Sequence, residues 1–244
     1  MKDLFSSASD RYAKYRPTYP DALYAFIRSQ LTHHDRAWDC ATGNGQVARQ
    51  LADDFDDIQA TDISAAQIAE AYQHPHIHYS LQPAEHTTFP DQHFDLITVG
   101  QAIHWFHFDR FYAEVNRTLK VNGLLAVIGY GLHSVSSRID PIIHHFYHEV
   151  IGPYWDPERK YLDEKYESIP FPFKEVSTPY FECSFTWTLA RFLGYIRTWS
   201  AVKKFIDQNG HDPVDDLNKA LEGLWGTEQK ITFPIFLRLG RKIL

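Results

Sequence analysis

A glycine-containing turn between two predicted elements carries the clearest chemistry in the sequence. Residues 38–48 read Trp-Asp-Cys-Ala-Thr-Gly-Asn-Gly-Gln-Val-Ala, where an apolar strand is predicted to end and a helix to begin. Gly43 and Gly45 permit a sharp turn and let a ligand approach the start of the helix without Cβ clashes. Asp62 ends the next predicted strand, where a carboxylate can accept hydrogen bonds from two ribose hydroxyls. The pattern predicts a site for a nucleoside cofactor.

The acid before this turn separates two kinds of cofactor. The spacing Gly43-x-Gly45-x-x-Ala48 by itself also matches the dinucleotide fingerprint, so a nicotinamide-dependent oxidoreductase stays open as an alternative. Asp39 closes the first predicted strand. Its carboxylate would repel a pyrophosphate, whereas it suits the cationic amino group of a methionine moiety.

Two further segments place polar and aromatic residues at the same edge of the predicted sheet. Residues 82–85 follow the third strand, where a backbone N–H and an acid can address an adenine edge. Residues 94–106 contain the fourth strand and then Gln101, His104 and Trp105. Because ligands of open α/β sheets bind at the carboxyl ends of the strands, these side chains are candidates for the site.

Alternating apolar runs and helical patterns predict a mostly parallel α/β sheet in the first half of the chain. Strands are expected up to Ala41 and at 58–62, 77–80, 94–99 and 124–129, and helices at 20–31, 46–53, 65–72 and 108–119. The pair Asn122-Gly123 is typical of the end of a helix.

After Gly131 the alternation stops. Helical patterns are expected at 140–151 and 189–208, with a weak strand at 181–187 and a last strand at 231–237, where Pro234 favours an edge or near-edge position. We therefore expect a single domain over 1–244. Its parts are an N-terminal lid and helix (1–35), a cofactor-binding core (36–130), an insertion on the substrate side (131–228) and a closing strand (229–244).

Composition narrows the function classes. The 244-residue chain is 44% hydrophobic, enough for one large α/β domain, and its formal net charge of -7 argues against a nucleic-acid partner. Neither a signal peptide nor a run of ~18 apolar residues that would span a bilayer is visible. Two cysteines are too few for a disulfide framework, so we expect a cytoplasmic protein without a membrane partner. The oligomeric state is not readable from the sequence.

The 14 histidines raise the question of a metal site. His144 and His148 lie four residues apart on a predicted helix, which is a spacing that can bind zinc. No nearby cysteine cluster supplies further ligands, so we expect no metal.

Several blocks follow one another in a recognisable order along nearly the whole chain. They are the entry segment 5–20, the turn 39–46, the strand end 60–64, the pair 84–85, the block 99–106, the segment 195–200 and the closing 233–235. In this order they resemble class I methyltransferases of the type 11 group, and more narrowly those similar to trans-aconitate methyltransferase. The turn departs from the commoner Asp-x-Gly-Cys-Gly form at Ala41, whose added methyl group should leave cofactor binding intact.

The resemblance implies S-adenosylmethionine as the cofactor. It also implies a Rossmann-like, seven-stranded, mostly parallel sheet with an antiparallel last strand and helices on both faces. It implies that the methionine part of the cofactor is contacted by Asp39, Ala41, Thr42, Gly43 and Gly45. It implies Asp62 at the ribose, Ile63 on the adenine with Ala84 and Glu85 at its rim, and Gln101, His104 and Trp105 beside the sulfonium and the acceptor.

Methyl transfer mainly requires alignment and exclusion of water. The ring of Trp105 can stabilise a sulfonium by cation–π attraction, and His104 is the best-placed base if the acceptor needs one. Arg16 can clamp an acidic group, or instead pair with Asp10 on the surface.

The acceptor is expected to be a small molecule, with a carboxylate oxygen as the first candidate. C- or O-methylation of a quinone-like planar metabolite is the runner-up. A protein that binds the cofactor without catalysis is the remaining alternative.

Overall fold

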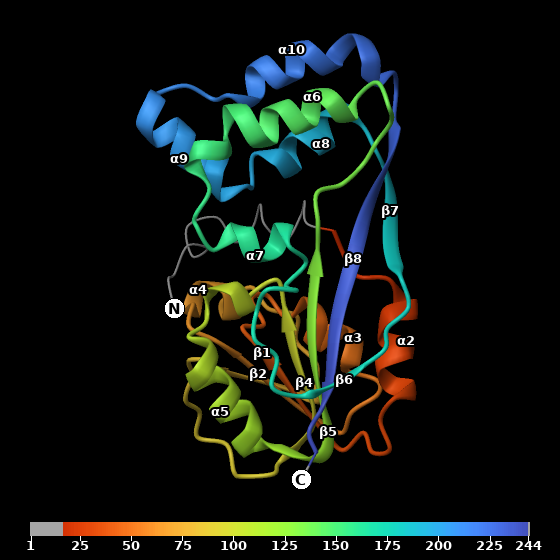
Figure 1. Cartoon of the computed structure of the whole chain (residues 1–244), viewed down its shortest axis with the longest axis vertical. Coiled ribbons are helices and arrows are strands. Elements are labelled where there is room, and N and C mark those ends of the chain that lie inside the picture. The colour runs from red at the N-terminus through yellow and green to blue at the C-terminus, as the bar shows by residue number, and fades with distance from the viewer. Residues whose placement is uncertain (1–16, 244) are drawn as a thin grey trace.

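The computed structural model describes residues 17–243 and consists of an α/β layer beneath a helical layer (Figure 1). The expectations for Arg16, for its pairing with Asp10 and for a lid over residues 1–16 lie outside the described residues. Within the described chain no helix is both long and apolar enough to cross a lipid bilayer.

The α/β layer is built on a mixed sheet with the strand order β3-β2-β1-β4-β5-β8-β6, and β7 also pairs with β8. The first five of these strands run parallel, whereas β8 is antiparallel to β5. The strands are β1 (Arg36–Cys40), β2 (Asp57–Asp62), β3 (Ile77–Leu81), β4 (Phe94–Gly100), β5 (Leu119–Tyr130), β6 (Lys174–Val176), β7 (Phe181–Trp187) and β8 (Gln229–Arg241). The predicted Rossmann-like, mostly parallel architecture with an antiparallel last strand is confirmed.

The described sheet has eight strands where seven were expected. Two strands of the 131–228 segment share one partner, because β8 is 13 residues long. β7 pairs with residues 229–235 of β8, and the short β6 pairs with residues 239–241. β8 therefore lies next to the edge of the sheet, which confirms the near-edge position expected from Pro234.

Helices cover the sheet and form the second layer. Those of the first half of the chain are α2 (Asp21–Ser29), which precedes β1, and α3 (Gln46–Leu51), α4 (Ala65–Ala69), η2 (Ile103–Trp105) and α5 (Phe108–Thr118), which connect parallel strands. Those of the later segment are α6 (Asp140–His145), η3 (Phe146–Val150), η4 (Gly152–Tyr154), α7 (Arg159–Asp163), α8 (Leu189–Ile196), α9 (Ser200–Asn209) and α10 (Val214–Trp225). Figure 1 shows α6, α8, α9 and α10 together in the upper layer, with α7 between that layer and the sheet.

The central strands are apolar because both their faces are covered. In β4 all residues from Phe94 to Val99 are buried, as expected for a parallel strand between two helical layers. One core cluster joins the sheet to α2, α3 and the upper layer, and a second joins the opposite face to α5 and α7. The carboxyl ends of the parallel strands point towards the upper layer (Figure 1), so a ligand site there would lie between the two layers.

Two boundaries differ from the sequence-based expectation. The helix α5 ends at Thr118 and β5 begins directly at Leu119, so interpreting Asn122-Gly123 as a helix end was wrong. Asn122 instead has a φ of 67° at an irregularity of the strand, and its N–H donates to the carbonyl of Lys242. The expected helix over 189–208 is broken into α8 and α9, where the Thr198 hydroxyl donates to the Tyr195 carbonyl and competes with the helical hydrogen bonds.

Candidate cofactor and acceptor site

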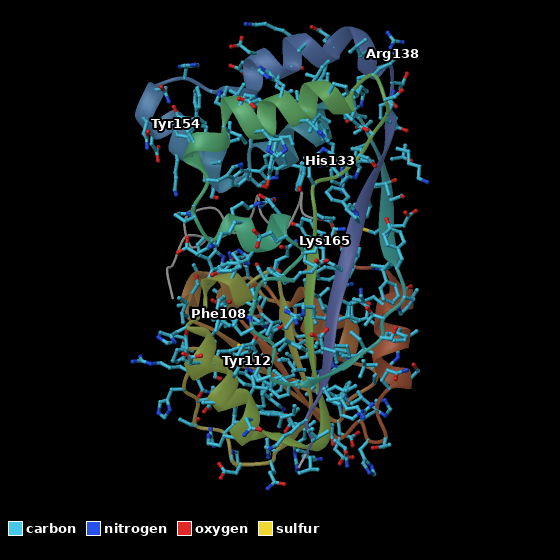
Figure 2. All side chains as sticks on the ribbon, viewed as in Figure 1. Phe108, Tyr112, His133, Arg138, Tyr154 and Lys165 are labelled. Atoms are coloured by element: carbon cyan, nitrogen blue, oxygen red, sulfur yellow. The ribbon has the colours of Figure 1, made fainter. Side chains whose placement is uncertain are left out.

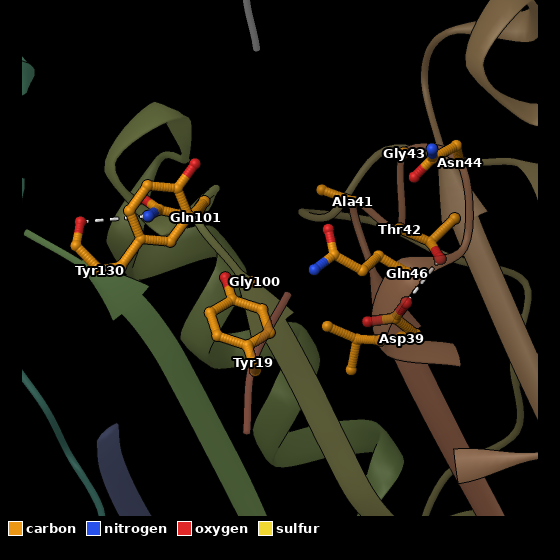
Figure 3. Close-up of a pocket in the computed structure, with 11 residues that line it drawn as sticks. Tyr19, Asp39, Ala41, Thr42, Gly43, Asn44, Gln46, Gly100, Gln101 and Tyr130 are labelled. Atoms are coloured by element: carbon orange, nitrogen blue, oxygen red, sulfur yellow. Dashed lines mark hydrogen bonds between the residues drawn. The ribbon is translucent and has the colours of Figure 1, made fainter. Parts of the chain in front are cut away.

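A cleft opens at the carboxyl ends of β1 and β4 (Figure 3). Here the chain order of the strands reverses, since β1 has β2 on one side and β4 on the other. The cleft is lined by Tyr19, Asp39, Ala41, Thr42, Gly43, Asn44, Gln46, Val47, Gly100, Gln101 and Tyr130. Five predicted site residues thus line one cleft: Asp39, Ala41, Thr42, Gly43 and Gln101.

The floor of the cleft holds a buried acid, Asp39, which is 1% exposed. Its Oδ2 accepts hydrogen bonds from the Thr42 hydroxyl at 2.5 Å and from the backbone N–H of Ala48 at 3.1 Å. Its Oδ1 accepts one from the Thr98 hydroxyl at 2.8 Å. Burial raises the pKa of Asp39 to about 6, although the three hydrogen bonds act to lower it. The group is therefore mostly ionised at neutral pH, and no Lys or Arg of the described chain pairs with it.

The turn beside Asp39 is held in a left-handed conformation. Ala41 has a φ of 55° and Gly43 a φ of 57°, and the Thr42 N–H donates to the carbonyl of Thr61 at 2.9 Å. For Ala41 this conformation is strained, because a Cβ is disfavoured at positive φ. The cleft wall therefore consists largely of backbone in a fixed shape.

Gly45 does not line the cleft, although the resemblance placed it at the cofactor. Its φ is 81°, and a Cβ at this position would lie 2.2 Å from the Tyr79 hydroxyl oxygen. Glycine is required here by close packing against Tyr79.

Four other predicted contacts lie around the cleft but not in its lining. Asp62 accepts hydrogen bonds from the N–H groups of Gly43 and Ser64, both at 2.9 Å, and so holds the turn in place. Glu85 accepts one from the N–H of His107 at the start of α5. Ile63 directly follows β2, and Ala84 is 2% exposed within the core that faces α5.

Sequence analysis did not select the two tyrosines that face the cleft. Tyr19 precedes α2 and Tyr130 ends β5, and their ring centroids are 6.3 Å apart. Gln101, which has a φ of 56°, donates from Nε2 to the carbonyl of Tyr130 (Figure 3). The signal for Tyr130 was its place at the carboxyl end of the strand after β4. Gln46, at the start of α3, donates to the carbonyl of Pro17 and ties the entry segment to the cleft.

His104 and Trp105 lie in η2, just beyond the cleft lining. His104 is 7% exposed, its Nδ1 lies 3.0 Å from the Tyr166 hydroxyl, and its ring centroid is 4.7 Å from that of Trp105. Burial, aided by the positive charge of Arg159, lowers the pKa of His104 to about 3. The imidazole is therefore neutral at physiological pH and is a weak proton acceptor.

The tyrosine that contacts His104 sits in a strained turn. Tyr166 is buried and has a φ of 64°, directly after Lys165 with a φ of 52°. Figure 2 places Lys165 between the two layers. Such conformations persist only where the surroundings impose them, and they concentrate at functional sites.

Comparisons with known proteins decide the family. A family model described as a methyltransferase domain matches residues 38–127. A Dictyostelium discoideum protein named as a proposed methyltransferase is 32% identical, and the match covers 98% of this chain and 95% of that protein. This chain belongs to the methyltransferase family.

Solved structures agree with this assignment. A proposed type II methyltransferase from Anaeromyxobacter dehalogenans is 36% identical with a TM-score of 0.87, over 94% of this chain and 99% of that one. A proposed methyltransferase from Bacillus halodurans, 18% identical with a TM-score of 0.53, covers 92% of this chain and 100% of its own and shares the fold. The protein is a class I methyltransferase by fold and by family.

An arginine and a histidine pair in the helical layer do not form a binding site with described residues. Arg197, in the segment 195–200, forms ion pairs with Asp212 at 2.6 Å and Asp215 at 2.8 Å. The rings of His144 and His148 lie 6.2 Å apart, and residues 17–243 contain no group of three or more His, Cys, Asp or Glu that could hold a metal ion.

Proposed function

We propose that this methyltransferase moves a methyl group from S-adenosylmethionine to a small-molecule acceptor, with a carboxylate oxygen as the methylated atom. The observation that carries the cofactor assignment is the ionised Asp39 on the floor of the cleft, with no described cation to neutralise it. A cationic ligand removes the cost of this unpaired charge, whereas an anionic ligand increases it.

The cleft fits a sulfonium cofactor better than a dinucleotide. None of the eleven described lining residues is Lys or Arg, so a pyrophosphate would bring two negative charges beside Asp39 without compensation. The aromatic rings of Tyr19 and Tyr130 offer π faces to a cation. The backbone of Ala41 to Gly43 allows a close approach, and Asp62 lies directly beneath it, where it can also accept from ribose hydroxyls.

The residues of this chain would act by binding and alignment. The bound cofactor supplies an electrophilic methyl group on a cationic sulfur. Gln101 and Tyr130 close one side of the cleft and exclude water from it, which favours transfer to the acceptor over side reactions. A carboxylate acceptor is already ionised and needs no base.

The state of His104 favours the carboxylate over a phenol or another acceptor that must lose a proton. With a pKa of about 3, His104 would accept such a proton poorly near neutral pH. We therefore assign His104 a hydrogen-bonding role beside the acceptor, with Trp105 as part of the wall. The quinone-like planar acceptor remains the second candidate, because aromatic side chains are dense above η2.

We assign each segment of the chain a role in the proposed reaction. The segment 36–130 holds the cofactor, and the segment 131–228 covers the acceptor, since its helix α7 packs against η2. Residues 17–35 close the cleft from the side of Tyr19, and β8 completes the sheet.

Calorimetric titration with S-adenosylmethionine, S-adenosylhomocysteine and NAD tests the cofactor. We expect both sulfur compounds to bind and NAD not to bind, and Asp62→Ala to weaken binding. Asp57→Ala, at the opposite end of the same strand, is the matched control and should bind normally. Binding of NAD alone would refute the proposed cofactor and support a nicotinamide-dependent oxidoreductase.

Methyl transfer from labelled S-adenosylmethionine tests the acceptor class. A panel of planar carboxylates and a panel of quinone-like phenols are compared, and the products are treated with mild base. Carboxyl methyl esters release methanol under base, whereas ethers and C-methyl products do not. Cofactor binding without turnover on either panel would instead favour a protein that binds the cofactor without catalysis.

A further inference from the structure

Within residues 17–243, one arginine between the two layers of the molecule has two terminal amino groups without a hydrogen-bond partner. Arg159 begins α7, which lies above the carboxyl ends of the strands (Figure 1). Its guanidinium carbon is 4.5 Å from the centroid of the Trp155 ring and 5.4 Å from that of Tyr147. The side chain is 19% exposed, so the charge is largely removed from solvent.

The position of this guanidinium is fixed from one side only. Nε donates to the Tyr147 hydroxyl at 2.8 Å and to Asp163 Oδ1 at 3.4 Å. The Tyr147 hydroxyl in turn donates to the same Asp163 oxygen at 2.7 Å. Neither Nη1 nor Nη2 donates a hydrogen bond to any residue in the described part of the chain. Two terminal amino groups in a rigid plane are thus available for a bidentate partner.

Arg159 also lies close to the reaction site proposed above. Its positive charge acts on His104 in η2, and η2 follows Gln101, which lines the cofactor cleft. On the other side an aromatic wall continues from Trp155, whose ring centroid is 5.7 Å from that of Trp199. The arginine therefore stands between the cofactor end of the sheet and an aromatic surface.

We propose that Arg159 binds the carboxylate of an anionic acceptor through its two terminal amino groups, while the planar apolar part of the acceptor lies against the neighbouring aromatic side chains. This assignment rests on the proposed function, because it concerns the acceptor side of the same site. The bidentate fit of guanidinium to carboxylate supplies both charge and orientation. The carboxylate so held is the anchor of the acceptor, whichever of its oxygens receives the methyl group.

A carboxylate fits this place better than a phosphate monoester. Asp163 already lies 3.4 Å from Arg159 and offsets part of its charge. The nearby cation Lys204 is engaged by Asp156 at 2.7 Å. A single, partly neutralised cation suits a monoanion, whereas a dianion would meet the acidic groups with too little positive charge.

Equilibrium binding of matched probes tests the proposal. Trans-cinnamate, its neutral amide cinnamamide, and phenyl phosphate are titrated into the full chain, and quenching of tryptophan fluorescence is followed with and without saturating S-adenosylhomocysteine. We expect the wild type to prefer cinnamate over cinnamamide by at least about tenfold, and Arg159→Gln to abolish this preference. Arg191→Gln is the matched control, because exposed Arg191 also stacks on a tryptophan, 5.2 Å from the Trp187 centroid, and it should keep the preference.

Other outcomes are equally decisive. Two results would show that Arg159 has only a structural role in packing against Trp155 and Tyr147. One is equal binding of cinnamate and cinnamamide by the wild type, and the other is an unchanged preference in Arg159→Gln. Tighter binding of phenyl phosphate would overturn the carboxylate assignment. If Arg159→Gln does not fold, Arg159→Lys keeps the charge but loses the fork, and the preference should fall without disappearing.

The failure of this inference is distinguishable from failure of the proposed function. Calorimetric binding of S-adenosylhomocysteine should be the same in the wild type, Arg159→Gln and Arg191→Gln. Loss of carboxylate preference with intact cofactor binding concerns Arg159 alone. Absence of cofactor binding in the wild type refutes the proposed function, whereas the titrations without cofactor still report on Arg159.

Discussion

The cofactor cleft and the region around Arg159 differ in the sign of the charge that each leaves unpaired. In the cleft the buried Asp39 carries a negative charge, and its described partners are hydroxyls and a backbone N–H. In α7, Arg159 carries a positive charge over aromatic rings, and its two terminal amino groups have no hydrogen-bond partner in the described part of the chain. A cationic ligand is complementary to the first region, and an anionic ligand is complementary to the second.

The two regions are also built differently. Seven of the eleven described residues that line the cleft come from the single segment 39–47. The Arg159 region brings together side chains from η2, η3, α7 and the start of α9, which are separated by up to about a hundred residues in sequence. Sites made of local backbone can be read from a sequence pattern, whereas sites made of distant side chains depend on the packing of the whole fold.

The largest effect should follow removal of the charge in the cleft. Asp39→Asn keeps the shape, and its amide oxygen can still accept from Thr42 and Ala48, but it loses the negative charge. We therefore expect the affinity for S-adenosylmethionine to fall by about 2 kcal/mol, roughly 30-fold. Asp95→Asn is the matched control, because Asp95 is also buried but pairs with Lys120 at 2.8 Å. It should lower stability and leave cofactor affinity unchanged in calorimetric titration. Equal affinity in Asp39→Asn and the wild type would refute the charge argument.

The same acid should make stability depend on pH. The pKa of Asp39 is raised from 3.8 to about 6 in the folded chain, so the folded state binds more protons than the unfolded state between these values. The contribution of Asp39 to the free energy of unfolding therefore falls as pH rises. We expect this contribution to be about 1 kcal/mol larger at pH 5 than at pH 7. Urea unfolding at both pH values measures this difference, with Asp39→Asn as the reference. A wild type that loses no more stability than Asp39→Asn on going from pH 5 to pH 7 would contradict the prediction.

The contact between His104 and Tyr166 should have a smaller effect. Tyr166→Phe removes the hydroxyl that lies 3.0 Å from His104 Nδ1, and we expect a loss of about 1 kcal/mol in unfolding free energy. Cofactor binding should not change, because Tyr166 does not line the cleft.

The pH dependence of the reaction tests the role of His104. For a carboxylate acceptor, the pH profile of kcat/KM should show no limb from His104 between pH 6 and 8, since the pKa of His104 is about 3. A limb in that range that disappears in His104→Gln would instead show that His104 acts as a base.

The smallest effect concerns the strain in the turn. Ala41→Gly should stabilise the protein by about 0.5 kcal/mol, because relief of the positive φ of 55° exceeds the entropic cost of glycine. Ala48→Gly, in the helix α3, should instead destabilise by about 1 kcal/mol. Thermal unfolding of the two variants compares them directly. A lower stability of Ala41→Gly would mean that the strain at Ala41 is compensated within the turn.

Much of the fold followed from local patterns. The continuous apolar run of β4 predicted a strand buried on both faces, because no helix-like periodicity interrupts it. Asn122-Gly123 misled, since the same pair that ends helices also serves an irregular strand, and only the pairing with the chain end decides between them. The packing of Gly45 against Tyr79 cannot be seen from the spacing of the turn.

The sequence by itself determined the glycine-containing turn, the positions of the parallel strands along the chain and the placing of an acid at the end of β1. These features depend on neighbours in the chain, through glycine conformations and the alternation of strand and helix. Only the tertiary structure decided which charges stay free. Arg197 and Arg159 both lie in the second half of the chain. Arg197 forms ion pairs with Asp212 and Asp215, whereas the terminal amino groups of Arg159 have no hydrogen-bond partner among residues 17–243. The neutralisation of a side chain depends on which distant groups the fold brings within hydrogen-bonding distance, and residue spacing carries no record of that.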